Sequence, residues 1–135
     1  MSMGYGGLCR KVAEDENMVI YEYAVYNLNI PEHKDARDIF DGRIIIEKSG
    51  LVEPEIHEKM KRMPSGRRNL TVKRIIQEIP FEELFAAGKI RIEDCSHCWK
   101  QMELGCDFVA FRLVMKIFRY YQENDKLPEE EGFHF

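Results

Sequence analysis

Near the C-terminus, the chain contains a stretch in which large apolar residues recur at helical spacing. Within residues 107–121, steps of three, four and three residues connect Phe108, Phe111, Met115 and Phe118. Asp107 stands where a short polar side chain caps a helix, and Arg112 marks the opposite, polar face. We expect a helix with Phe111, Met115 and Phe118 buried. Because such a helix needs a second layer to cover its apolar face, it limits the rest of the chain to folds that supply one.

Several earlier stretches are typical of β-strands. Alternate residues of the stretch 18–29 are apolar or aromatic, and they fall on one face of a strand: Val19, Tyr21, Tyr23 and Val25. The stretch 7–12 is also strand-like, and the acidic stretch 13–17 predicts a turn that joins the two into a hairpin. Further strands are expected at three places: 42–48, 69–79 and 89–95.

Two shorter helices are also expected, at 54–63 and 80–88. In the first, Pro54 fits the opening position of a helix and Glu53 suits its positive end. The element order predicts one α+β domain over residues 1–135. Its mainly antiparallel sheet of about five strands opens with a hairpin, and helices, including the long C-terminal amphipathic helix, pack on one face.

The cellular location is inferred from segments that the chain lacks. No apolar run approaches the ~20 residues that cross a bilayer, and residues 1–11 lack the apolar segment of a signal peptide. We therefore expect a cytoplasmic protein that does not bind membranes and whose four cysteines are reduced thiols.

One basic segment stands out in an otherwise acidic chain. Residues 59–74 contain seven cations and no carboxylate, although the whole chain has 20 cations and 24 carboxylates. Candidate partner-binding residues are Tyr26 and five of these cations: Arg62, Arg67, Arg68, Lys73 and Arg74. Because a helix at 54–63 would turn its cations in different directions, nucleic-acid binding by this segment is expected to be weak and non-specific.

Cys95 and Cys98 have the spacing of half a zinc site or of a redox pair. Cys106 and Cys9 are the only other cysteines that could complete a metal site. However, the neighbouring Glu93 and Asp94 disfavour a thiolate, and no second close pair is present. We expect these cysteines to pack as small apolar groups, with no metal and no cofactor bound.

No complete catalytic motif accompanies this pair. His57 begins a sequence like that of a zinc-protease helix, but Lys61 replaces the second histidine. The leading hypothesis is a small, non-enzymatic protein-interaction domain of regulatory or toxin-neutralising type. One alternative is a nucleic-acid or phosphate binder that uses residues 59–74, and another is an enzyme or a zinc or redox module that uses Cys95, Cys98 and His57. The sequence does not identify the partner or the oligomeric state.

Overall fold

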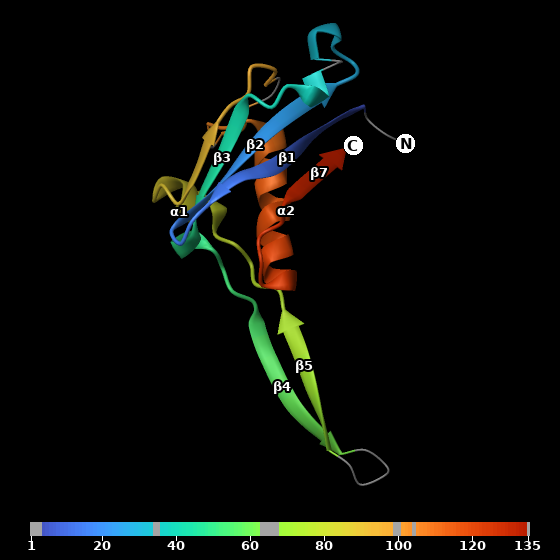
Figure 1. Ribbon diagram of the computed structural model, residues 1–135, viewed down its shortest axis with the longest axis vertical. Coiled ribbons are helices and arrows are strands. Elements are labelled where there is room, and N and C mark those ends of the chain that lie inside the picture. The colour runs from blue at the N-terminus through green and yellow to red at the C-terminus, as the bar shows by residue number, and fades with distance from the viewer. Residues whose placement is uncertain (1–3, 34–35, 63–67, 99–100, 104, 135) are drawn as a thin grey trace.

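The computed structural model describes residues 4–33, 36–62, 68–98, 101–103 and 105–134, and it has an antiparallel sheet covered by helices (Figure 1). The strand order is β6-β3-β2-β1-β7, and every pairing between neighbours is antiparallel. The bounds of these strands are β1 Tyr5–Glu14, β2 Met18–Asn27, β3 Gly42–Glu47, β6 Ile90–Glu93 and β7 Glu130–His134. The predicted α+β class, with a five-stranded sheet, is confirmed.

The predicted opening hairpin is formed by β1 and β2. Asp15 closes the turn, because its Oδ1 accepts hydrogen bonds from the backbone N–H groups of Asn17 and Met18 at 2.7 and 2.8 Å. All four residues of the predicted apolar strand face are fully buried: Val19, Tyr21, Tyr23 and Val25. Strand alternation therefore identified the inner face of the sheet correctly.

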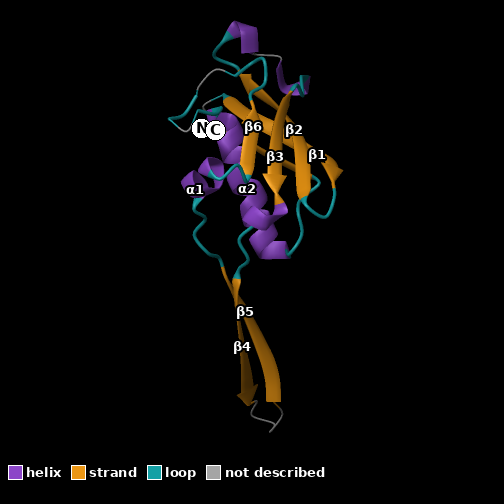
Figure 2. Cartoon of the chain, turned by 90° about the vertical axis from the view of Figure 1, so that its left-hand side faces the viewer, coloured by secondary structure: helices purple, strands orange, loops and turns teal. Residues whose placement is uncertain are grey.

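Helix α2, Phe108–Asn124, crosses that inner face (Figure 2). The predicted cap is confirmed, since Asp107 Oδ1 accepts from the Val109 N–H at 3.0 Å. The buried positions differ in part from those expected: Val109, Ala110, Leu113, Val114, Ile117, Phe118 and Gln122. Phe118 is buried as predicted, but Phe111 and Met115 are only half-buried.

The position of Phe111 has a packing explanation. Its ring contacts α1, Phe81–Ala86, with centroids 5.2 Å from Phe81 and 6.2 Å from Phe85. The predicted stripe followed the largest side chains, whereas the sheet covers the neighbouring row that includes Leu113 and Ile117. Phe111 therefore lies where α2 meets α1, at the margin of the core.

The prediction of a helix over 54–63 is wrong. Residues Glu55–Arg62 form strand β4, which pairs antiparallel with β5, Arg68–Ile75, as a separate two-stranded sheet. This hairpin, which we call the ribbon, projects from one end of the body (Figure 1). Eight consecutive residue pairs join the two strands, and this long-range pairing outweighs the local helix signal around Pro54.

The remaining elements agree more closely with the predictions from the sequence, except for one strand that was not predicted. Helix α1 and strand β6 lie within the predicted stretches 80–88 and 89–95, and two short 3₁₀ turns, Pro31–His33 and Ala36–Asp38, connect β2 to β3. Strand β7 was not predicted, and it forms an outer edge of the sheet beside β1. Among the residues that the structure describes, no helix has the length and apolar character needed to cross a membrane.

Candidate functional site

The register of the ribbon separates its residues into two faces. In an antiparallel pair, residues directly opposite each other share a face, and so do residues two apart along a strand. One face, the arginine face, contains Ile56, Glu58, Met60, Arg62, Arg68, Leu70, Val72 and Arg74. The other, the lysine face, contains Glu55, His57, Lys59, Lys61, Asn69, Thr71, Lys73 and Ile75. The three arginines of the paired strands thus share a face with four apolar residues, and the three lysines share the other.

Charge also separates the ribbon from the body. Residues 55–75 contain seven cations and two carboxylates, a net charge of +5, so the rest of the chain has 13 cations and 22 carboxylates, a net charge of −9. At 0.1 M salt, charges in water are largely screened beyond ~10 Å. The body's carboxylates therefore have little effect on cations far out on the ribbon.

The structure places the predicted partner-binding residues in two regions. Four of them lie on the ribbon: Arg62, Arg68, Lys73 and Arg74. Arg67 lies outside the described residues, and Tyr26 is half-buried on β2, in the body. The expectation of weak nucleic-acid binding assumed a helix at 54–63, and that assumption no longer holds.

The cysteine pair lies in a turn between β6 and α2, where the Cys98 N–H donates to the Cys95 carbonyl oxygen at 3.2 Å. All four cysteines are free thiols, and burial raises the pKa of Cys95 and of Cys106 to about 11 and that of Cys9 to about 12. Thiolate chemistry at these three residues is therefore disfavoured at neutral pH. Within the described ranges, no three His, Cys, Asp or Glu residues gather closely enough to hold a metal ion. His57 lies on β4, away from this turn.

A buried polar network surrounds Cys95, and the sequence did not predict it. The Tyr23 hydroxyl donates to Asp107 Oδ2 at 3.1 Å and accepts from the Cys95 N–H at 2.9 Å. Asp94 joins the network, because its Oδ1 accepts from the Asp107 N–H at 2.9 Å. These bonds connect β2, the turn after β6 and the start of α2. The network therefore holds the turn in place, and the buried thiol of Cys95 is one of its neighbours.

We expect Tyr23→Phe to lower the free energy of unfolding by about 1–3 kcal/mol, because it leaves the buried Cys95 N–H without its acceptor and removes the hydroxyl that donates to Asp107 Oδ2. Tyr21→Phe is the matched control. Tyr21 is equally buried, but its hydroxyl lies outside this network and donates to the Pro128 carbonyl oxygen at 2.6 Å. Urea denaturation of both variants should rank Tyr23→Phe as the more damaging, and an equal loss would contradict a special role for the network.

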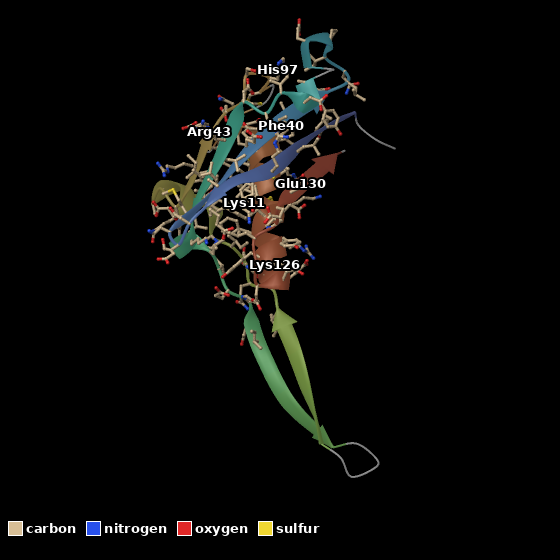
Figure 3. The ribbon with its side chains drawn as sticks, in the orientation of Figure 1. Lys11, Phe40, Arg43, His97, Lys126 and Glu130 are labelled. Carbon is tan, nitrogen blue, oxygen red and sulfur yellow. The ribbon has the colours of Figure 1, made fainter. Side chains whose placement is uncertain are left out.

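The outer face of the sheet, opposite α2, has an alternating row of charges. The strand registers align Glu130, Arg10, Glu22, Arg43 and Glu93 from β7 to β6. Arg10 forms an ion pair with Glu22, and its guanidinium lies 4.1 Å from the centroid of the Phe40 ring. Phe40, Arg43 and Glu130 are labelled in Figure 3. Opposite charges on adjacent strands offset one another across most of this face.

A groove of about 430 Å³ lies at the β7 end of this row. We call it the edge groove, and its lining residues are Leu8, Cys9, Arg10, Phe40, Glu130, Glu131 and Gly132. Its walls are partly apolar, since Leu8 is 40% exposed. The molecule thus offers two candidate binding features, the projecting ribbon and the edge groove.

No protein-family model matches the chain, and no curated protein or solved structure is significantly similar to it.

Proposed function

We propose that this chain is a protein-interaction domain that docks through its ribbon. The observation that carries the proposal is a two-stranded sheet separate from the main sheet and projecting from the body (Figure 1). An isolated two-stranded hairpin is at best marginally stable in water, so this one gains free energy if a partner covers it. Ile56, at its base, is 50% exposed, which supports an apolar contribution to binding.

The arginine face is the better candidate for the contact. Arginine, methionine and the aromatic residues are enriched in protein interfaces, whereas lysine is depleted there. The arginine face combines Arg62, Arg68 and Arg74 with Met60, and the lysine face has the composition of a solvated surface. The preferred partner surface is acidic, with an apolar centre. A regulatory or toxin-neutralising role fits this reading and stays a prediction from the sequence.

Nucleic acid is the second candidate, and the shape of the ribbon favours it. Each ribbon strand has eight residues, about 27 Å of extended chain, and a two-stranded ribbon fits the major groove of duplex DNA. The seven cations of 59–74 could then neutralise phosphates. The acidic composition of the whole chain, with a sequence pI of about 5.6, opposes this reading.

Photo-cross-linking in cells that express the protein tests the proposal. A photoreactive amino acid replaces Ile56 on the ribbon in one variant and the exposed Ala87, next to α1, in a control variant. We expect a discrete protein adduct from position 56 and none from position 87. Adducts that contain nucleic acid from position 56 would favour the second candidate. Equal labelling from both positions, or no adduct from position 56, would contradict docking through the ribbon.

A further inference from the structure

We propose that Tyr121 and Gln122, in the last turn of α2, bind the chain just before β4 and just after β5, and so hold the ribbon in one orientation for its partner. We call these two positioning residues the clasp. The inference rests on the proposed function, because it concerns how the ribbon is presented for docking. Three observations support it: the burial of Gln122, the hydrogen bonds from the clasp to both connecting segments, and the packing of these segments on the body.

Gln122 is a polar residue at the end of an apolar row. Val114, Phe118 and Gln122 follow one another at steps of four along α2, so they lie on one side of the helix, and all three are buried. Gln122 itself is 0% exposed. A buried amide without hydrogen-bond partners costs free energy. A glutamine at this position therefore implies specific polar partners.

Gln77 supplies such partners through its backbone. It lies two residues beyond Ile75, where β5 ends. Gln122 Oε1 accepts from the Gln77 N–H at 2.7 Å, and Gln122 Nε2 donates to the Gln77 carbonyl oxygen at 3.1 Å. Antiparallel strands fix each other with a pair of bonds to the N–H and carbonyl groups of one residue, and the Gln122 amide makes the same two kinds of bond. The outgoing end of the ribbon is thus attached to α2.

The incoming end is attached to the same turn of α2. The Tyr121 hydroxyl donates to the carboxylate of Glu53, two residues before β4 begins at Glu55. The intervening Pro54 is buried, and its ring restricts the backbone there. Gln77 also links the two ends directly, because its Nε2 donates to Glu55 Oε2 at 3.3 Å. The two ends of the ribbon are therefore joined to each other and to the clasp.

Both connecting segments also pack on the body. Leu51 and Ile79 lie against the hydrophobic core, and the two segments pass the C-terminal end of α2 (Figure 1). Because a two-stranded sheet has little stability of its own, the direction of the ribbon depends on these attachments. A ribbon held in one orientation loses less conformational entropy when a partner covers it, and this favours binding.

Residual dipolar couplings of the backbone amides test the clasp without a partner. We expect the couplings of β4 and β5 in the wild type to fit the alignment tensor of the main sheet. Gln122→Met keeps an unbranched side chain of similar length but cannot form the two bonds to Gln77. In this variant, the ribbon couplings should shrink and no longer fit that tensor, because motion of the ribbon averages them. Tyr121→Phe loses only the bond to Glu53 and should reduce the ribbon couplings in part.

Two control variants separate the clasp from a general loss of stability. Val114→Ala shortens a residue of the same buried row without touching the clasp. Gln77→Ala removes the Gln77 side chain but keeps the backbone groups that Gln122 binds. We expect the ribbon couplings of both controls to stay close to those of the wild type. Either control loosening the ribbon as much as Gln122→Met would contradict the role of the clasp.

A wild-type ribbon whose couplings do not fit the tensor of the main sheet would overturn the inference. Unchanged ribbon couplings in Gln122→Met would also overturn it, and Tyr121→Phe is the deciding variant if that chain does not fold. Cross-linking from position 56 then tests the consequence for binding. The adduct should fall several-fold in Gln122→Met, because the partner must order the freed ribbon, and an unchanged yield would refute the role in presentation. A fixed wild-type ribbon that gives no adduct would refute docking and leave the clasp standing.

Discussion

Replacing Phe118 with alanine is expected to lower the free energy of unfolding by about 3–5 kcal/mol. The side chain is only 1% exposed, lies on the face of α2 that covers the sheet, and contacts the ring of Phe81 at a centroid distance of 5.6 Å. Truncation removes its apolar surface from the core and leaves a cavity that the packed sheet cannot fill. Urea denaturation, analysed by midpoint and slope, measures the change.

Phe111→Ala is the matched comparison on the same helix. The Phe111 ring is half-buried and packs against α1 and not against the sheet, so its loss is expected to cost less, about 1.5–3 kcal/mol. A cost for Phe111→Ala equal to or above that for Phe118→Ala would mean that the stripe read from the sequence, and not the row seen in the structure, faces the core.

Phe118 and Phe111 show what sequence periodicity can and cannot predict about a helix. The helix and its cap at Asp107 could be predicted because spacing and capping depend on neighbouring residues alone. Which row of the helix is most buried depends on where the sheet and α1 lie, and only tertiary packing determines that. The inner face of β2 was easier to predict than the buried row of the helix, because the alternation of side chains gives a strand only two faces and one of these was strongly apolar.

The ribbon could not be predicted from its first strand alone. Pro54 and the neighbouring carboxylates resemble the start of a helix, and Ile56 and Met60 also fit helical spacing. The same residues fit a strand once β5 is available as a partner, and that pairing joins residues as far apart as Glu55 and Ile75. Strand β7 was missed for a related reason. Its glutamates and Gly132 have low β-propensity, so its strand conformation depends on pairing with β1.

The candidate site was predictable in composition but not in arrangement. Counting charges located the cations of 59–74, whereas their division into an arginine face and a lysine face required the register. The Tyr23–Asp107 contact joins residues 84 apart in sequence, and no local pattern indicates that a strand tyrosine meets a helix cap. The edge groove similarly depends on β7, the strand that the sequence did not reveal.

The buried cap has a consequence for the pH dependence of stability. Asp107 is fully buried, and this burial raises its pKa from 3.8 to about 6, although the hydrogen bonds from the Val109 N–H and the Tyr23 hydroxyl act in the opposite direction. The nearby Asp94 raises the pKa further. Because the folded state binds the proton more tightly than the unfolded state, the stabilisation is complete below about pH 4 and is lost as the pH rises through about 6.

Relative to Asp107→Asn, the wild type is therefore expected to lose about 3 kcal/mol of stability between about pH 4 and about pH 7. Asparagine keeps an oxygen that can accept from the Val109 N–H but does not ionise, so any cost of its altered contact with Tyr23 is the same at every pH. Glu14 and Asp15 have lowered pKa values, held by Lys11 and by backbone N–H groups respectively, and they act in the opposite direction in both proteins. Urea denaturation of both proteins at a series of pH values measures the free energy of unfolding, and the difference between the two proteins at each pH isolates the contribution of Asp107. If the free energies of the two proteins changed in parallel with pH, the ionised form of Asp107 would not be disfavoured in the fold.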